Sequence, residues 1–147
     1  MRIVNSKARF DYTILDHLEA GVQLTGAEVK SLRGNRATLD GAYIKILSSE
    51  LYLIGAHIFP YPFARPENYD PKRTRKLLVH KKEILRLKQK IDADGLTLVP
   101  LSWYTKGLHI KMEVGLAKGK KQYEKRDLIK KREDKRNLER TFRGKVK

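Results

Sequence analysis

Apolar and polar positions alternate along much of this chain, which is typical of strands that bury one face. Alternation, or a short apolar run between turn residues, predicts about six strands. They are expected over residues 10–24, 38–47, 51–59, 77–79, 96–104 and 108–117. Turns at residues 48–50 and 106–107 would join four of these strands into two hairpins. Gly21, inside the first predicted strand, indicates a bulge or bend.

Helical spacing occurs in two places in the body of the chain. Thr25-Gly26-Ala27-Glu28 has the form of a capping box, in which Thr25 and Glu28 exchange hydrogen bonds at the start of a short helix. Gly34 would end that helix in a left-handed conformation. A longer helix is expected over His80–Asp94, with His80 as its cap and a glycine stop at residue 95. Three apolar side chains share one of its faces: Ile84, Leu87 and Ile91.

These elements favour a mainly β protein without βαβ alternation or internal repeats. Short strands and bulging glycines suit a small closed antiparallel barrel of oligonucleotide-binding (OB) type, with one short and one longer helix. An α+β roll is the alternative fold. Trp103 and Tyr43 are expected in the core because both lie in apolar strand patterns. We expect one OB-type domain over residues 1–117, with residues 1–9 as a polar N-terminal arm.

Residues 118–147 differ sharply in composition from the body. Fourteen of these thirty residues are Lys or Arg and five are Asp or Glu, so the segment carries a net charge of +9. With few apolar side chains to bury, the segment is predicted to be a tail that is disordered when free. Residues 122–143 could form a helix once a partner orders them. Such dense positive charge is expected to fold against phosphate.

The overall composition of the chain also favours an anionic partner. The 147 residues include 33 Lys and Arg against 17 Asp and Glu, which favours an anionic polymer or surface as partner. The absence of Cys excludes disulfides, thiolate zinc sites and cysteine nucleophiles. The sequence has no signal-peptide core and no apolar stretch long enough to span a membrane. We expect a cytoplasmic protein that needs no membrane, works as a monomer and binds no metal or cofactor.

From the residues alone, two specific functions are open alternatives. One is an architectural OB-fold protein that binds single-stranded nucleic acid, since six aromatic residues could stack on bases. They are Tyr12, Tyr43, Tyr61, Tyr69, Trp103 and Tyr104. The other is a magnesium-dependent nuclease or RNA-modifying enzyme, built on carboxylates that the fold would have to bring together. The candidates are Glu19, Glu28, Asp40 and Glu113, whereas the four histidines lack metal-ligand spacing.

Several motifs, in order along nearly the whole chain, carry a family resemblance. They are Asn5-Ser6-Lys7-Ala8-Arg9, Glu19-Ala20-Gly21, residues 26–33 (GAEVKSLR), residues 70–78 (DPKRTRKLL), residues 95–101 (GLTLVPL) and residues 117–121 (AKGKK). In this ordered combination the chain resembles the SsrA-binding proteins (small protein B) of bacterial trans-translation. The resemblance implies an OB-type barrel that binds the tRNA-like domain of transfer-messenger RNA (tmRNA, also called SsrA RNA). It also implies delivery of that RNA to the A site of stalled ribosomes by a protein that catalyses no reaction.

The resemblance and the charge pattern together give the expected site residues. Six positions match RNA contacts of the family: Asn5, Lys7, Arg9, Glu19, Leu78 and Lys111. Five other basic residues of the body are expected to extend this surface: Arg33, Arg36, Arg75, Lys76 and Lys106. The family's tail enters the empty mRNA channel at the decoding centre, near small-subunit rRNA. The tail positions expected there are Lys118, Gly119, Lys120, Lys121, Tyr123, Arg126, Ile129, Lys130 and Arg132.

The chain departs from the family pattern at two places. The family often has Arg-Ala-Gly where this chain has Arg33-Gly34-Asn35, and Asn also tolerates the left-handed conformation, so the turn is expected to persist. In the tail, Leu128 stands where the family usually has Asp, so the contact of that Asp is not carried over to this chain.

Overall fold

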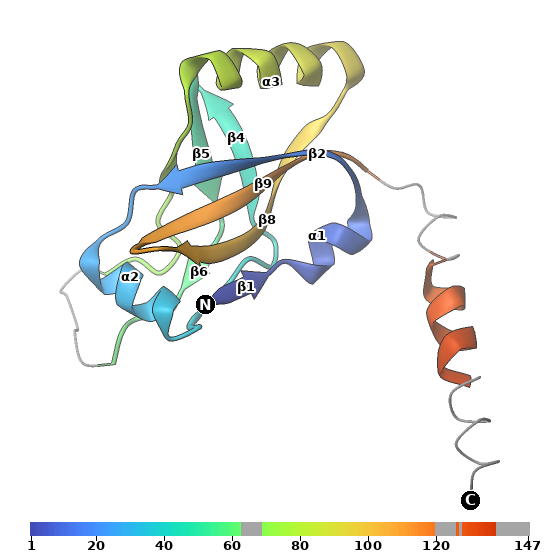
Figure 1. The fold of residues 1–147 in the computed structure, drawn as a ribbon, viewed down its shortest axis with the longest axis horizontal. Helices are drawn as coiled ribbons and strands as arrows, with labels where there is room; N and C mark the ends of the chain where they lie inside the picture. Colours follow the sequence, from blue (N-terminus) through green and yellow to red (C-terminus); the bar gives the residue numbers. More distant parts are fainter. Residues whose placement is uncertain (63–68, 120–125, 127, 138–147) are drawn as a thin grey trace, which may run out of the picture.

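A computed structural model describes residues 1–62, 69–119, 126 and 128–137 of the chain. Strands and helices follow one another along the body as labelled in Figure 1. The strands are β1 (Arg2–Val4), β2 (Tyr12–Val22), β3 (Ala37–Thr38), β4 (Tyr43–Leu47), β5 (Glu50–Ile54), β6 (His57–Ile58), β7 (Arg75–Leu78), β8 (Thr97–Lys106) and β9 (His109–Gly119). The helices are α1 (Ser6–Asp11), α2 (Gly26–Arg33) and α3 (Lys81–Asp94).

Strand pairing closes a barrel. The main sheet runs β1-β8-β4-β5-β7-β2-β9, and an additional β8–β9 pairing joins its far end back to β8. Every pairing in it is antiparallel. The closed ring contains six strands, and β1 is added along β8 outside the ring. The predicted mainly β fold with an antiparallel barrel is therefore confirmed, and closure removes the exposed edges that a flat sheet would leave.

Local turn chemistry explains the two predicted hairpins. Ser48 and Ser49 both adopt positive φ angles, 50° and 61°, between β4 and β5, as a two-residue hairpin turn requires. Gly107, with φ of 61°, lies between β8 and β9. Both hairpins occur where the sequence predicted them. The strand ladder, however, shifts register between Ile14 and Asp16 rather than at Gly21, so the predicted position of the bulge was wrong.

Two of the four helix signals acted as expected, those at the start of α2 and at the end of α3. Thr25 and Glu28 form both hydrogen bonds of the capping box at the start of α2. The left-handed residue after α2 is Asn35, with φ of 57°, rather than Gly34, whose φ is −87°. Gly95 ends α3 with φ of 63°. His80 occupies the cap position of α3, but its side chain makes no capping hydrogen bond.

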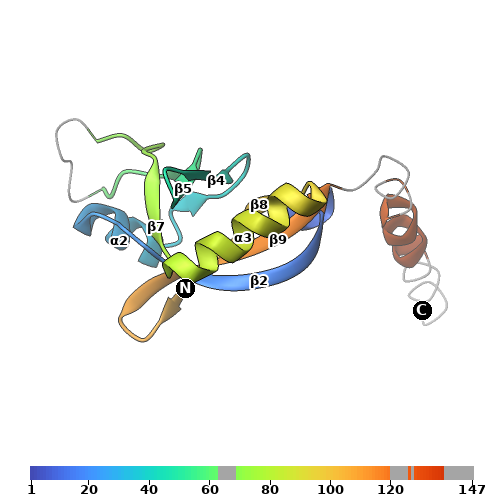
Figure 2. The same cartoon turned by 90° about the horizontal axis from the view of Figure 1, so that it is seen from above.

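The barrel interior contains the main hydrophobic core. Trp103 is fully buried, and Ile84 and Leu87 of α3 pack into the same core. Helix α3 lies on one side of the barrel, while α1 and α2 lie on the other (Figure 1; Figure 2 shows α3 from above). Tyr43 is 49% exposed, so its predicted core position was wrong. It precedes the buried Ile44 in β4, and neighbouring residues of a strand point to opposite faces.

Residues 1–9 do not form the predicted polar arm. Strand β1 pairs with residues 102–104 of β8, and α1 follows it directly. Asn5 connects the two elements because its side-chain oxygen accepts a hydrogen bond from the Ala8 backbone at the start of α1. The amide nitrogen of Asn5 donates to the Pro100 carbonyl at 2.9 Å and to the Leu39 carbonyl at 3.4 Å. These contacts to distant residues fix the N-terminal segment against the barrel.

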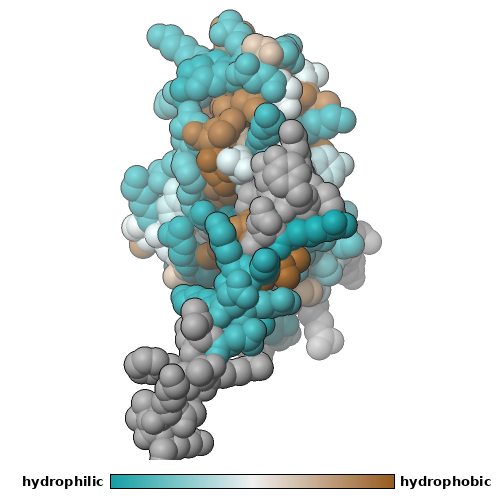
Figure 3. All heavy atoms as spheres, turned by 90° about the vertical axis from the view of Figure 1, so that its right-hand side faces the viewer, coloured by the Kyte–Doolittle hydropathy of each residue, from teal (hydrophilic) through white to brown (hydrophobic). Residues whose placement is uncertain are grey.

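The last strand ends two residues later than the predicted residue 117. Strand β9 continues through Lys118 to Gly119, which pairs with Tyr12. In the described part of the tail, residues 126 and 128–137 are helical, and the Arg132 guanidinium lies 5.3 Å from the centroid of the Phe10 ring. Hydrophilic residues cover most of the face from which the tail leaves, with a band of hydrophobic residues between them (Figure 3). Among the described residues, no helix is both long and apolar enough to cross a membrane.

Candidate nucleic-acid interface

One outward face of the barrel gathers polar and charged side chains from four neighbouring strands. Cross-strand partners in a sheet project to the same side. Glu19 of β2 is opposite Glu113 of β9, which is opposite Ser102 of β8. One step along the ladder, Lys111 is opposite Tyr104, which is opposite Arg2 of β1. We call this surface the β2–β9 face; it comprises Arg2, His17, Glu19, Tyr104, Lys106, Lys111 and Glu113, with the buried Ser102 beneath it.

Glu19 lies near the centre of the β2–β9 face. Its Oε2 accepts a hydrogen bond from the Tyr104 hydroxyl, and its Oε1 lies 3.2 Å from Lys106 Nζ. The Tyr104 hydrogen bond, followed by the Lys106 ammonium, lowers the pKa of Glu19. Burial and the Glu19 hydrogen bond raise the pKa of Tyr104. At neutral pH Glu19 is therefore an ionised acceptor, and Tyr104 remains a neutral hydrogen-bond donor.

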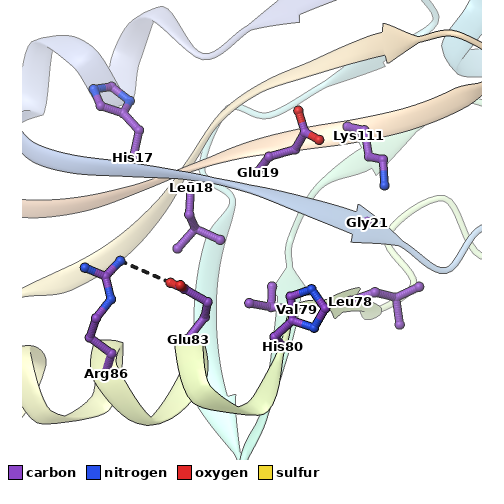
Figure 4. Close-up of a pocket in the computed structure, with 10 residues that line it drawn as sticks. All are labelled: His17, Leu18, Glu19, Gly21, Leu78, Val79, His80, Glu83, Arg86 and Lys111. Carbon is purple, nitrogen blue, oxygen red and sulfur yellow. Dashed lines mark hydrogen bonds and ion pairs between the residues drawn. The ribbon is translucent and has the colours of Figure 1, made fainter.

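A pocket of about 650 Å³ opens beside Glu19, between β2 and the first half of α3 (Figure 4). Glu19 and Lys111 line it together with Leu78, which is 47% exposed at the end of β7. Asp16 lies 3.7 Å from a nitrogen of both Arg86 and Lys90, so ion pairs connect β2 to α3 along this pocket. The pocket thus combines an acceptor, a cation and an apolar side chain, which suits a nucleoside whose base is unstacked.

Glu113 forms a second charged group on the same face. His17 Nδ1 lies 2.8 Å from Glu113 Oε1. Arg2 and Arg9 approach Glu113 Oε2 at 3.4 and 3.6 Å. A hollow of about 410 Å³ lies against this group and the Glu19–Tyr104 pair. It shares three residues with the larger pocket: His17, Leu18 and Glu19.

Comparison with known proteins assigns a family to a chain with this geometry. The sequence profile described as SmpB protein matches residues 2–144. The chain belongs to the SmpB protein family. It is 48% identical over 143 residues to the SsrA-binding protein of Sulfurihydrogenibium sp. (strain YO3AOP1), covering 97% of this chain and 94% of that relative. It is 49% identical over 140 residues to the SsrA-binding protein of Carboxydothermus hydrogenoformans, covering 95% and 94%.

A solved structure supports the SmpB assignment at the level of fold. The chain matches a protein from the structure described as "tmRNA-SmpB: a journey to the center of the bacterial ribosome", with a TM-score of 0.68 and 45% identity. The match covers 82% of this chain and 85% of that chain. The body therefore has the SmpB fold.

The structure places three of the predicted RNA contacts of this SmpB family member around the pocket: Glu19, Leu78 and Lys111. Lys106 lies beside these three residues because its ammonium contacts Glu19. Arg9 contacts Glu113 on the β2–β9 face. Lys7 is exposed on α1. Five of the predicted contacts therefore lie on or beside the β2–β9 face: Arg9, Glu19, Leu78, Lys106 and Lys111.

Two predicted contacts are buried instead. Asn5 is 3% exposed, and its side chain is fully engaged in joining β1, α1 and the barrel. Arg75 is fully buried, with its Nε 2.6 Å from Glu28 Oε2 and its two terminal nitrogens bonded to the Ala56 and Pro71 carbonyls. Their positions support a structural role and leave no side-chain surface for RNA.

The other basic residues of the body lie elsewhere. Lys76 is half-buried and approaches Glu50 at 3.6 Å on the neighbouring strand β5. Arg33 donates a hydrogen bond to the Leu108 carbonyl at the tip of the β8–β9 hairpin, which places it beyond Lys106 at the edge of the face. Arg36 is exposed just after α2. Of these three, only Arg33 adjoins the β2–β9 face.

The tail residues can be placed only in part. Lys118 and Gly119 are exposed at the end of β9. Lys120, Lys121 and Tyr123 lie outside the described residues. Arg126, Ile129, Lys130 and Arg132 are exposed in the helical part of the tail. A contact of any of these residues with a ribosome remains a prediction.

Two of the carboxylates proposed for a magnesium site, Glu19 and Glu113, are cross-strand neighbours, but Glu28 lies elsewhere in the fold. Glu28 is 1% exposed and already bonded to Arg73 and Arg75. Glu19 and Glu113 each have basic or hydroxyl partners, and no group of three acidic, His or Cys side chains in the described part of the chain could hold a metal ion.

Sequence reasoning missed four members of the β2–β9 face as a group. Arg2 was placed in an arm, and His17 and Glu113 were weighed only as metal ligands. Tyr104 was considered for stacking, whereas its hydroxyl is bonded to Glu19. The signal was present in the two-residue period, because His17 and Glu19 must share a face of β2 while Leu18 points to the other (Figure 4).

Proposed function

We propose that the protein binds the tRNA-like domain of tmRNA through the β2–β9 face and carries it to stalled ribosomes. The observation that carries this proposal is the convergence of Glu19, Leu78 and Lys111 on one pocket in an SmpB family member. The relatives named SsrA-binding proteins support the identity of the RNA. The solved structure described as tmRNA-SmpB supports the ribosome as the second partner.

The chemistry of the pocket fits a folded RNA with exposed loop nucleotides. Glu19 has acceptor capacity for a ribose hydroxyl or a base amine, because each carboxylate oxygen accepts more than one hydrogen bond. Lys106 and Lys111 supply positive charge for the phosphates that flank such a nucleotide. Leu78 offers an apolar contact for the base itself. Loops and elbows of RNA present bases in this unstacked form, whereas regular duplex does not.

The basic tail is proposed to act on the ribosome rather than on tmRNA. Its net charge of +9 over residues 118–147 suits a path lined by rRNA phosphates, and its helical residues 128–137 present mainly charged side chains. In this proposal the tail occupies the mRNA channel and the body stays with the tRNA-like domain. The protein then works as a monomeric adaptor, without catalysis of its own.

A competition experiment tests both parts of the proposal. The full chain and a chain ending at Gly119 are each titrated with a labelled tRNA-like RNA, at several salt concentrations, against an unlabelled unstructured oligomer of equal length. We expect both proteins to prefer the folded RNA at matched salt, because the specific contacts lie on the barrel. The shorter chain should show a smaller salt dependence because it lacks the tail's cations.

Two results would reject the proposal. Equal affinity for the folded and unstructured RNAs would favour the architectural single-strand-binding function instead. A preference that disappears with the tail would show that the β2–β9 face is not the tmRNA site. Circular dichroism of the shorter chain, which must retain the barrel spectrum, is the control.

A further inference from the structure

We propose that Arg2, Arg9 and His17, gathered by Glu113, form a phosphate-binding subsite that extends the RNA surface beyond the Glu19 pocket. This inference rests on the proposed RNA-binding function of the same face. It assigns Glu113 as a positioning residue: a carboxylate that arranges the cations which meet the RNA backbone.

The four side chains come from four different elements. Arg2 belongs to β1, Arg9 to α1, His17 to β2 and Glu113 to β9. The carboxylate lies at the base of the group, with 21% of its side chain exposed. The basic side chains surround it and are more open, at 57% for Arg2, 43% for Arg9 and 51% for His17. The group therefore presents its cationic atoms to solvent and its anion inward.

The charge balance favours an additional anion. Glu113 is approached by two guanidinium groups at once, so its single negative charge is shared between Arg2 and Arg9. The arginine distances of 3.4 and 3.6 Å exceed the 2.7–2.9 Å of a strong charged hydrogen bond. A guanidinium carries five N–H donors, and Arg2 directs one hydrogen bond at Glu113. A phosphate with two free oxygens matches the remaining donor edge of Arg2.

The subsite is continuous with the Glu19 pocket. The Arg2 guanidinium lies 5.9 Å from the centroid of the Tyr104 ring, and the Tyr104 hydroxyl donates to Glu19. The hollow of about 410 Å³ is lined by Arg2 and Glu113 on one side and by Glu19 and Tyr104 on the other. A nucleotide held at Glu19 would therefore place a neighbouring phosphate within reach of this group.

A purely structural role for Glu113 explains the arrangement less well. Backbone pairing of residues 2–4 with β8 already holds β1, and Asn5 already fixes α1. Exposed ion pairs add little to the stability of elements that are held in this way. Glu113 also places a negative charge on a face that is proposed to bind a polyanion. Such a charge is understandable if it arranges cations that would otherwise repel one another.

The inference is tested by whether Glu113→Gln weakens or strengthens RNA binding. Removing a negative charge from an RNA-binding surface, with nothing else changed, strengthens binding. We expect Glu113→Gln to do the opposite and to weaken binding of the tRNA-like RNA by about 3–10-fold, with the salt slope reduced by about 1. Glu50→Gln is the matched control, because it removes the same charge from the Glu50–Lys76 pair outside both hollows. That control should bind as tightly as the natural chain or slightly more tightly.

A double-mutant cycle adds a second readout. Arg2→Ala should weaken binding on its own, but should cost less in the Glu113→Gln background, because both changes act on one group. Additive effects would overturn the positioning role. Unchanged or tighter binding by Glu113→Gln would overturn the subsite, and so would a loss of binding matched by a large fall in the unfolding midpoint. Lys111→Ala separates the two proposals: if it too leaves binding unchanged, the proposed function of the face fails as well.

Discussion

Two glutamates of this protein are each approached by two arginines, and their surroundings differ. Glu28 is 1% exposed and lies 2.6 Å from nitrogens of both Arg73 and Arg75. Glu113 is 21% exposed and lies 3.4 and 3.6 Å from its two arginines. One glutamate and two arginines thus form a tight group inside the fold and a loose one on its surface.

The comparison shows that burial decides what such a group can do. Around Glu28 nearly every donor has a partner: Arg75 also bonds two carbonyls, and Glu28 also accepts from the Thr25 backbone. A buried charge must be paired in this way, because an unpaired one is strongly destabilising. Around Glu113 solvent screens the charges, so the ion pairs add little stability, and the Arg2 side chain, 57% exposed, can meet another anion. One group organises α2 and β7, whereas the other is suited to binding.

The largest expected effect comes from Glu28→Gln. This change leaves the fully buried Arg75 without a carboxylate and should lower the free energy of unfolding by about 3–5 kcal/mol. Urea denaturation followed by circular dichroism measures it. RNA binding at a temperature where the variant is folded should be nearly unchanged, because Glu28 does not line the Glu19 pocket. A loss below about 1 kcal/mol would mean that the buried group resembles the surface group after all.

Acid should weaken the buried group in a defined direction. Burial, the largest influence, raises the pKa of Glu28, but hydrogen bonds from Arg73, Thr25 and Arg75 together outweigh it and hold the pKa below its ordinary value. A carboxyl with a lowered pKa in the folded state stabilises the fold above its unfolded pKa of about 4.3 and loses that contribution as pH falls. The natural chain should therefore lose stability more steeply than Glu28→Gln below about pH 4.

The measured quantity is the difference in unfolding free energy between the natural chain and Glu28→Gln. Other carboxylates titrate in both chains and cancel in the comparison. The gap in unfolding free energy should stay constant between about pH 7 and 5 and narrow below about pH 4. A gap that is independent of pH down to about 3 would show that Glu28 gains nothing from its charge in the folded state.

Local sequence signals predicted the parts of the fold that depend on neighbouring residues. The capping box at Thr25, the hairpin at Gly107 and the end of α3 at Gly95 are all set by residues within a few positions. The N-terminal segment could not be predicted in this way. Its polar composition is typical of an exposed arm. The buried Asn5 side chain, however, donates hydrogen bonds to carbonyls that are 34 and 95 residues away in sequence. Long-range partners of this kind leave no local pattern.

The candidate site was predictable to a similar extent. Glu19, Leu78 and Lys111 were named through family resemblance, and only the folded barrel shows that they share a pocket. Arg75 was taken for a surface cation. It stands two residues before the buried Leu77 in β7, and the two-residue period of a strand puts both on the inner face. Tyr43 was misplaced for the same reason, so strand parity is a better guide than residue type at these positions.

The smallest expected effect completes the comparison. Glu113→Gln should change the free energy of unfolding by less than about 1 kcal/mol, because its ion pairs are exposed and β1 and α1 have other attachments. The glutamine can still accept from Ser102, so no buried hydroxyl loses its partner. Urea denaturation beside Glu28→Gln measures the contrast under identical conditions. A loss as large as that of Glu28→Gln would make Glu113 a structural residue, because a group that the fold requires cannot be explained by binding alone.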